Sequence, residues 1–331
     1  MKTKELLSVL NKVKPGIAAK NIIESMTYFY FSGTNIITYN DKISIQHQLQ
    51  TDFALFVKAQ DLYNLVSKIT TKDIDLVEKD GKLNISCKTM KAKLSTINDS
   101  EIKIRIDEIS TLIEKAKWKP LSENFSESVK VCVYTASKQD SDGTLTCIYV
   151  NGKNCISSDN ARISHSILKS DMDEMFIKAS EVQSLINTNP TEYAISNSWL
   201  HFKNEEGCIF SIRKVSGEYP DFLQFFEFEG EKVELSKGVL EGIDLTSVLV
   251  DDSDPAIKFK ISNNSTLLSI KSDGGTVTHR SKIKYDGKDI EFTINPEFLK
   301  EMMRHSSTII LGKDKAKLKT ENFSLLTTLY G

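Results

Sequence analysis

Residues 57–66, VKAQDLYNLV, decide the fold, because the chain repeats their pattern twice more. The second copy is residues 177–186, IKASEVQSLI, which starts 120 residues later, and the third is residues 294–303, INPEFLKEMM, another 117 residues on. Each copy has an acidic residue in its first turn and then apolar residues at helical spacing, so each predicts a short helix. Because the spacing is close to an ordinary domain length, we expect a chain made of three copies of one unit.

The composition narrows the class of protein. The chain has 331 residues, with 43 Lys and Arg against 45 Asp and Glu, so it lacks the excess charge of a strongly basic nucleic-acid binder. No apolar run is long enough to span a bilayer, and the first residues lead into a helix rather than a signal peptide. The five cysteines contain no C-x-x-C pair, which indicates neither a disulfide framework nor a zinc site. We therefore expect a cytoplasmic protein.

Each third of the chain predicts the same order of elements: helix, strands, helix, strands. In the first third, residues 6–14 predict a helix that ends at Pro15-Gly16. The strands expected there are residues 26–31, 36–39, 43–47, 74–77, 83–86 and 90–97. Residues 100–119 are charged and predict an irregular connector.

The second and third units continue this order. Residues 125–137 and 239–250 predict helices, and Asn151-Gly152 predicts the turn of a hairpin. The remaining predicted strands are residues 145–150, 153–157, 193–196, 199–202, 208–215, 257–261, 267–270, 277–285, 290–294, 308–311 and 325–330. The predicted fold class is α+β, in three domains that span residues 1–118, 119–235 and 236–331. Open sheet edges in such repeats can pair with one another and close a ring, with helices lining it and sheets outside.

No motif in the sequence indicates catalysis. The chain has neither a P-loop nor a G-x-G-x-x-G fingerprint. The five histidines have no metal-ligand spacing; they are His47, His165, His201, His279 and His305. The acidic run at residues 251–254 lacks the EF-hand spacing and favours a solvated turn over a cation site. We expect no enzyme activity, no cofactor and no metal.

Several segments resemble bacterial DNA polymerase III β sliding clamps. Residues 56–97 resemble the first clamp domain through FVKAQDLYNLVSKI, IDLVEKDGKLNISC and AKLSTI. Residues 157–163, SSDNARI, are similar to the clamp segment A-T-D-G-H-R-L, and residues 215–222, VSGEYPDF, to D-G-x-[YF]-P-D-Y. The final residues LLTTLYG stand where clamps end V-V-M-P-M-R-L. The resemblance covers nearly the whole chain, in order.

The resemblance implies a function and partners. Clamps of this family are head-to-tail dimers of three-domain subunits, which form a six-domain ring around duplex DNA. They tether the replicative polymerase and meet the clamp loader through short peptides, and they have no catalytic residues and no cofactor. We therefore expect a DNA-encircling processivity factor that acts at DNA in the bacterial cytoplasm.

The expected DNA contacts are cations on the helices that would line the ring and on adjoining loops. They are Lys12, Lys14, Lys20, Lys58, Lys68, Lys138, Lys178, Lys237, Lys300 and Arg304. The alternative is that they are ordinary surface residues, but the repeated helix carries a cation in all three copies. A ring that holds DNA by enclosure needs only weak, sequence-independent phosphate contacts, so a near-neutral total charge is no objection.

By motif position, the family's partner-peptide cleft maps onto residues of the second and third units. These are Ser158, Asn160, Ala161, Arg162, Ile163, Pro220, Phe225, Leu325, Thr327, Thr328, Leu329 and Tyr330. The alternative is that the apolar members fill a domain core. Asn160-Ala161 replaces the usual Gly-His and Thr328 the usual Pro, so the family's peptide preference does not carry over. Such departures fit a divergent copy, for example one encoded by a phage.

The family also pairs a strand of domain one, here residues 90–97, with a strand of domain three, here near residues 276–283. The residues expected at this dimer interface are Met90, Lys91, Lys93, Leu94, Val248, Leu249, Val277 and His279. Lys91 and Lys93 would face a segment with Arg280 and Lys282, where clamps usually offer acids. Like charges across a strand pair destabilise it, so we expect a weak dimer.

Two other function classes stay open at this point. A non-catalytic triplicated-domain interaction or structural protein would share the repeat but would not encircle DNA. A sequence-reading DNA binder would need a base-reading module, and the sequence contains none that we identify.

Overall fold

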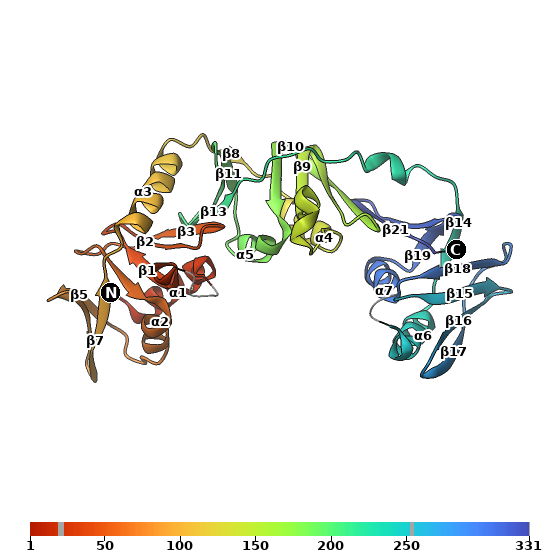
Figure 1. Ribbon diagram of the computed structural model, residues 1–331, viewed down its shortest axis with the longest axis horizontal. Coiled ribbons are helices and arrows are strands. Elements are labelled where there is room, and N and C mark those ends of the chain that lie inside the picture. Colours follow the sequence, from red (N-terminus) through yellow and green to blue (C-terminus); the bar gives the residue numbers. More distant parts are fainter. Residues whose placement is uncertain (19–22, 252–254, 331) are drawn as a thin grey trace. The chain divides into compact units, whose positions relative to one another are not determined.

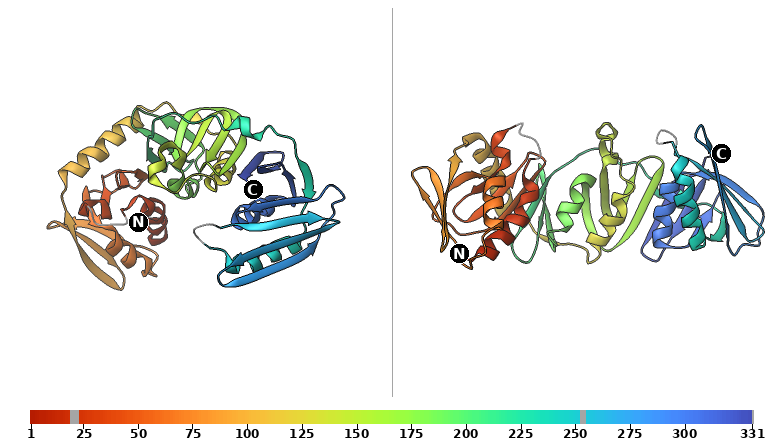
Figure 2. Two further views of the ribbon diagram at one scale, coloured as in Figure 1. Left: turned by 45° about the vertical axis from the view of Figure 1, so that its right-hand side comes forward. Right: turned by 90° about the horizontal axis from the view of Figure 1, so that it is seen from below.

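The computed structural model describes residues 1–18, 23–251 and 255–330 (Figures 1 and 2). Lys20, residues 252–254 of the acidic run and Gly331 lie outside the described residues. Contacts divide the chain into two units: unit 1, residues 1–126 and 175–216, and unit 2, residues 127–174 and 217–331. The predicted α+β class is confirmed. The division into three domains near residues 118 and 235 stays a prediction.

Unit 1 is built on one eleven-stranded sheet, in the order β5-β6-β7-β4-β1-β2-β3-β13-β12-β11-β8. Its strands are β1 (Tyr28–Phe31), β2 (Asn35–Tyr39), β3 (Ile43–Gln48), β4 (Leu55–Lys58), β5 (Asp75–Lys79), β6 (Lys82–Cys87), β7 (Met90–Ile97), β8 (Lys119–Pro120), β11 (Glu192–Ile195), β12 (Trp199–Lys203) and β13 (Ile209–Arg213). β3 pairs with β13 in antiparallel register, with Ile45 opposite Phe210. The sheet therefore joins strands of the first and second repeats.

The helices α1 (Thr3–Val13) and α2 (Ala59–Ser67) pack against each other and against this sheet. Their apolar faces are fully buried at Leu6, Leu10 and Leu62. The Tyr63 hydroxyl donates to Asn11 Oδ1 at 2.9 Å and links the exposed sides of the two helices. The helical spacing of apolar residues thus predicted both helices correctly.

Residues 100–119 are not the irregular connector that the sequence predicted. They contain α3 (Ser100–Glu114), whose N-cap Asp99 accepts hydrogen bonds from the N–H groups of Glu101 and Ile102 at 3.0 Å. The helix buries isoleucines at helical spacing: Ile102, Ile106, Ile109 and Ile113. They pack in one cluster with aromatic residues of the sheet, among them Tyr39 and Trp199. The charges that suggested a loop are mostly on the exposed face of this helix.

Unit 2 contains a six-stranded sheet, β14-β19-β20-β21-β10-β9, and a four-stranded sheet, β17-β16-β15-β18. The strands are β9 (Cys147–Ser158), β10 (Arg162–Lys178), which extends into unit 1, β14 (Glu231–Glu234), β15 (Ile257–Ser262), β16 (Ser265–Ser272), β17 (Gly275–Lys282), β18 (Ile290–Ile294), β19 (Thr308–Leu311), β20 (Lys315–Lys319) and β21 (Phe323–Thr328). The helices α6 (Lys237–Thr246) and α7 (Pro296–His305) contact each other, and their apolar residues share one core with both sheets. The helix α4 (Phe125–Val133) begins at the end of unit 1's first segment.

The predicted hairpin turn at Asn151-Gly152 is wrong. Both residues lie inside the single strand β9, where Gly152 has a φ of 57°. A glycine with positive φ serves a turn or an irregularity within a strand, so the Asn-Gly signal fits either. The chain instead turns at residues 159–161, where Asn160 has a φ of 70°.

The three repeated segments begin their helices with the same backbone geometry. The N-cap residues Lys58, Lys178 and Asn295 have φ of −59°, −56° and −64° and ψ of 120°, 121° and 122°. The second copy continues as a 3₁₀ turn, Ala179–Glu181, followed by the short helix α5 (Val182–Ile186), whereas α2 and α7 are continuous. The repeat read from the sequence is therefore a repeated strand-to-helix junction.

The packing of α3 generates the first prediction. We expect Ile106→Ala to reduce the free energy of unfolding by about 2–5 kcal/mol, because Ile106 is 2% exposed in the core. The matched control is Ile104→Ala on the same helix, where the side chain is 58% exposed and the loss should be about 0.5 kcal/mol or less. Urea unfolding followed by tryptophan fluorescence reports on this cluster, because Trp118 and Trp199 both belong to it. Equal small losses for the two variants would contradict the packing.

Candidate functional site

The predicted DNA-contacting cations differ in their partners. On α7, Lys300 Nζ donates to Asp244 Oδ1 of α6 at 2.6 Å, and Arg304 donates to Glu301 Oε2 at 2.6 Å. The hydrogen bond to Asp244 is the main cause that raises the pKa of Lys300. These two cations are therefore already partly neutralised by carboxylates of the same unit.

In unit 1, Lys12 forms an ion pair with Glu206, and the ammonium group of Lys14 lies 3.9 Å from the centre of the Tyr63 ring. Lys178 is half-buried at the N-cap of the second repeated helix. The remaining candidates are exposed and form no ion pair within the described residues: Lys58, Lys68, Lys138 and Lys237. This last group has the cations most available to phosphate.

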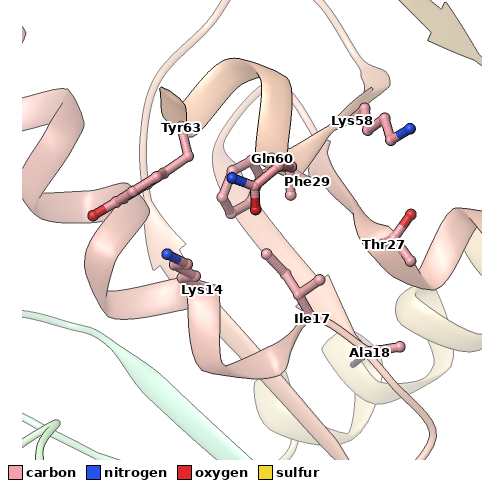
Figure 3. A pocket seen from close by; sticks show the side chains of 9 residues that line it. Lys14, Ile17, Ala18, Thr27, Phe29, Lys58, Gln60 and Tyr63 are labelled. Atoms are coloured by element: carbon pink, nitrogen blue, oxygen red, sulfur yellow. The ribbon is translucent and has the colours of Figure 1, made fainter. Parts of the chain in front are cut away.

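Lys14 and Lys58 line one pocket of about 320 Å³ in unit 1 (Figure 3). Its walls come from the 3₁₀ turn Lys14–Gly16 and the residues after it, from the segment that enters β1, and from the start of α2. The pocket brings together two cations that are 44 residues apart in the sequence. No carboxylate is among its lining residues.

Within the predicted cleft, the turn at residues 158–162 is held by several side-chain hydrogen bonds and an ion pair. Asp159 Oδ1 accepts hydrogen bonds from the N–H groups of Ala161 and Arg162, and its Oδ2 lies 2.6 Å from the Arg162 guanidinium. Ser158 Oγ donates to the Arg162 carbonyl at 2.8 Å. Asn160 occupies a left-handed conformation, which asparagine tolerates better than most residues, so it can stand where a glycine is usual.

The C-terminal strand β21 pairs with β10 directly after this turn. Ile163 is opposite Leu326, Arg162 is opposite Thr327, and the Thr328 N–H donates to the Ala161 carbonyl at 2.9 Å. Because side chains alternate between the faces of a strand, Ile163 and Leu326 share one face while the residues before and after them point to the other. The tail therefore contributes to two different surfaces.

The structure does not bring all the predicted cleft residues together. Leu325 and Leu329 are 5% and 8% exposed and belong to the core shared by α6, α7 and the sheets. Arg162 lies over the Phe298 ring at 4.1 Å, and Tyr330, 42% exposed, bridges to Thr293 of β18. For Leu325 and Leu329 the structure supports the alternative of core residues.

Ile163 belongs instead to an aromatic cluster that covers the other face of the sheet. Its buried members are Ile156, Ile163, Phe222, Phe226 and Leu326, and Leu145, Tyr219, Leu223 and Phe228 are partly buried at its margin. Phe225 is 44% exposed, with its ring 6.3 Å from that of Phe222, and Pro220 is also exposed. Lys317 Nζ donates to the Phe226 carbonyl at 2.6 Å and holds this segment on the sheet.

Sequence reasoning missed Leu326 and most of the aromatic cluster. Two signals were available: residues 219–228 contain five aromatic side chains, and the alternation rule separates Leu326 from its neighbours Leu325 and Thr327. The first signal marks an apolar surface, and the second selects the tail residue that faces it.

The residues expected at a dimer interface lie on two open strand edges, those of β7 and β17, except Val248 and Leu249, which lie in the 3₁₀ turn Ser247–Leu249. β7 pairs with β4 only through Thr96 and Ile97, so residues 90–95 have no partner strand on that side within the described residues. β17 is the edge of the four-stranded sheet. Of the predicted residues, Lys91, Lys93 and Val248 are exposed, and Met90, Leu94, Leu249, Val277 and His279 are half-buried.

None of the helices in the described ranges combines the length and the apolar character needed to span a bilayer. Within the same residues, no three His, Cys, Asp or Glu side chains are grouped closely enough to hold a metal ion.

Comparison with known proteins identifies the fold. No family model matches the sequence, and no curated protein matches it. Among solved structures, the DNA polymerase β subunit of Streptococcus pyogenes matches 100% of this chain and 98% of its own, with 20% identity and a TM-score of 0.86. The DNA polymerase III β chain of Streptococcus pneumoniae (19% identity, TM-score 0.85) and the sliding clamp of Bartonella birtlesii bound to griselimycin (13%, 0.85) match over the same shares. The chain thus has the fold of the DNA polymerase III β sliding clamps along its whole length.

The two surfaces at the C-terminal tail generate the second prediction. Leu329→Lys should lower the free energy of unfolding of unit 2 by about 3–5 kcal/mol, because it places an unpaired charge in the core. Phe225→Lys, at the exposed margin of the aromatic cluster, should cost about 1 kcal/mol or less. Thermal unfolding of both variants tests whether Leu329 is a core residue. A melting temperature for Leu329→Lys equal to that of the wild-type protein would place that side chain in an open cleft instead.

Proposed function

We propose that this protein is a DNA sliding clamp: a processivity factor that encircles duplex DNA and tethers a replicative polymerase. The observation that carries the proposal is the match of the whole chain, with 98% of each comparison chain covered, to clamps and to no other kind of protein among the similar structures reported above. The repeated strand-to-helix junction supports it, since a ring of equivalent domains needs equivalent building blocks.

Enclosure of DNA explains why several of the expected DNA-contacting cations are paired with carboxylates and so are not free to bind phosphate strongly. A ring linked topologically to DNA must slide, so strong phosphate contacts would oppose its function. Lys300 and Arg304 have carboxylate partners at 2.6 Å, which compete with phosphate for the same cations. The exposed lysines, such as Lys58 and Lys68, supply weak contacts that do not depend on base sequence.

Partner binding is assigned to the aromatic cluster beside the tail. A peptide from a polymerase or a clamp loader would place apolar side chains against the accessible margin of this cluster, at Phe225, Leu223 and Phe228, above the buried Ile163 and Leu326. Full burial of one such anchor contributes about 1.5–3 kcal/mol. The turn at Asp159 and Arg162 fixes the backbone at one end of this surface, so little ordering is required on binding.

Ring closure is assigned to the open edges of β7 and β17, paired between two copies head to tail. Antiparallel pairing would satisfy the free N–H and C=O groups of both edges. Val248, 78% exposed, and the half-buried Leu249 would supply apolar contact beside the new strand pair.

Retention on circular DNA tests the proposed function. We expect the protein, loaded on a nicked circular plasmid, to co-elute with the DNA in gel filtration and to be released when a restriction enzyme linearises the circle. Release follows because only topology, and not affinity, holds a sliding ring. Binding that is equal on circular and linear DNA, or absent on both, would favour the alternative of a triplicated-domain interaction protein.

The charges on the two edges generate a prediction about assembly. Lys91 and Lys93 are exposed on β7, as are Arg280 and Lys282 on β17, so joining the edges brings like charges together. We expect sedimentation velocity to show more dimer at about 0.3 M salt than at about 0.03 M, because salt screens this repulsion.

The variant Lys93→Glu provides the matched control. It should tighten the dimer at low salt and reverse the sign of the salt dependence, since it converts repulsion into attraction. A wild-type dimer that weakens steadily with salt would reveal attractive pairs across the interface and contradict the assignment of these edges.

A further inference from the structure

The pocket between Lys14 and Lys58 has features that mere enclosure of DNA does not require. Its floor is apolar: Phe29, fully buried, and Ala59, 2% exposed, form its foundation, and the half-buried Ile17 and Ala18 supply the apolar surface that a ligand can contact. Its volume, about 320 Å³, is near the lower end of the range for small-molecule sites. A flat surface lysine that touches a phosphate needs no such cavity.

The rim of the pocket is polar and positively charged. Lys14 is held over the Tyr63 ring at 3.9 Å, and the Tyr63 hydroxyl is fixed in turn by Asn11 at 2.9 Å. Figure 3 shows the Gln60 side chain over the Phe29 ring, with Lys14 and Lys58 on opposite sides of the rim. Neither lysine forms an ion pair in the part of the chain that the structure describes.

The pocket has an apolar floor and two cations at its rim, and no carboxylate is among its lining residues. Such a pocket suits a ligand with a flat apolar body and an anionic group. A nucleotide has both, and single-stranded nucleic acid is recognised in this way, by bases on apolar and aromatic surfaces and phosphates on cations. A base inside a duplex is stacked and paired, so it could not enter the cavity.

We propose that this pocket binds one unpaired nucleotide of single-stranded DNA, with the nucleobase toward Ile17 and Ala18 and its two flanking phosphates toward Lys14 on one side and Lys58 on the other. The proposal rests on the proposed function for its choice of DNA as the ligand, and it adds a site specific for unpaired DNA. A clamp with such a site prefers junctions between duplex and single strand over continuous duplex.

The test uses Gln60→Glu, which places a carboxylate in the pocket without a change in side-chain shape. Gln60 is exposed in the first turn of α2, where an acidic residue is compatible with the helix, so the variant should fold normally. The matched control is Gln50→Glu, the same substitution at an exposed residue of unit 1 outside the pocket lining.

The probes are a fluorescent single-stranded thymidine oligonucleotide, an abasic oligonucleotide of equal length and a blunt duplex, each titrated by anisotropy. We expect the wild-type protein to bind the thymidine strand about tenfold more tightly than the abasic strand, as base stacking contributes. Gln60→Glu should abolish this preference, whereas Gln50→Glu should retain it. Equal effects of the two variants, or a wild-type protein that does not distinguish the two strands, would reduce the pocket to part of a general basic surface.

Retention on a nicked circle separates this proposal from the proposed function. Gln60→Glu should still be retained, because topological linkage does not use the pocket. Wild-type protein that is retained but shows no preference for the thymidine strand would contradict the proposed nucleotide site and leave the proposed clamp function standing. Protein that shows the preference but escapes from circles would overturn the clamp and leave a single-strand-binding site.

Discussion

Pairing between strand edges is the interaction on which the rest of this structure depends. In unit 1 β3 pairs with β13, and in unit 2 β10 pairs with β21, so each large sheet is built from strands of different repeats. Each pairing satisfies backbone groups that an isolated repeat would expose. In contrast, residues 90–95 of β7 and the outer side of β17 have no partner strand within the described residues, so their backbone groups stay open to pairing. In the proposed assembly, a second copy of the chain would offer the complementary edge for each.

The proposed DNA-contacting surface and the proposed peptide-binding surface depend on different interactions. Of the cations expected at DNA, some are paired, as Lys300 is with Asp244, and the exposed lysines would contribute weak contacts that permit movement. The aromatic cluster around Ile163 and Phe222 instead offers apolar area that releases water when a partner covers it. Enclosure and tethering therefore need not compete: one requires low affinity for a polymer, and the other requires defined affinity for a short peptide.

Much of the fold could be predicted from the sequence because its repeat is local: an acid in the first turn and apolar residues at helical spacing recur three times. α3 was missed because charges dominate residues 100–114, although the spacing of Ile102, Ile106 and Ile109 contained the helical signal. The cleft was predicted only in part. Motif alignment located the turn at Asn160, but only the pairing register of β10 with β21 shows that Leu326, and not Leu325, lies on the face of Ile163. Register depends on contacts between residues more than 150 positions apart, which a single sequence does not reveal.

Hydrogen–deuterium exchange over a range of protein concentrations tests the central claim, that two open edges close the assembly, most directly. If copies join through these edges, the amides of residues 90–95 and the outward amides of β17 gain protection together as concentration rises through dimer formation. The edge strand β5 should stay unchanged and provides the internal reference. Dimer formation without protection at β7 and β17, or with protection at β5 instead, would contradict the account.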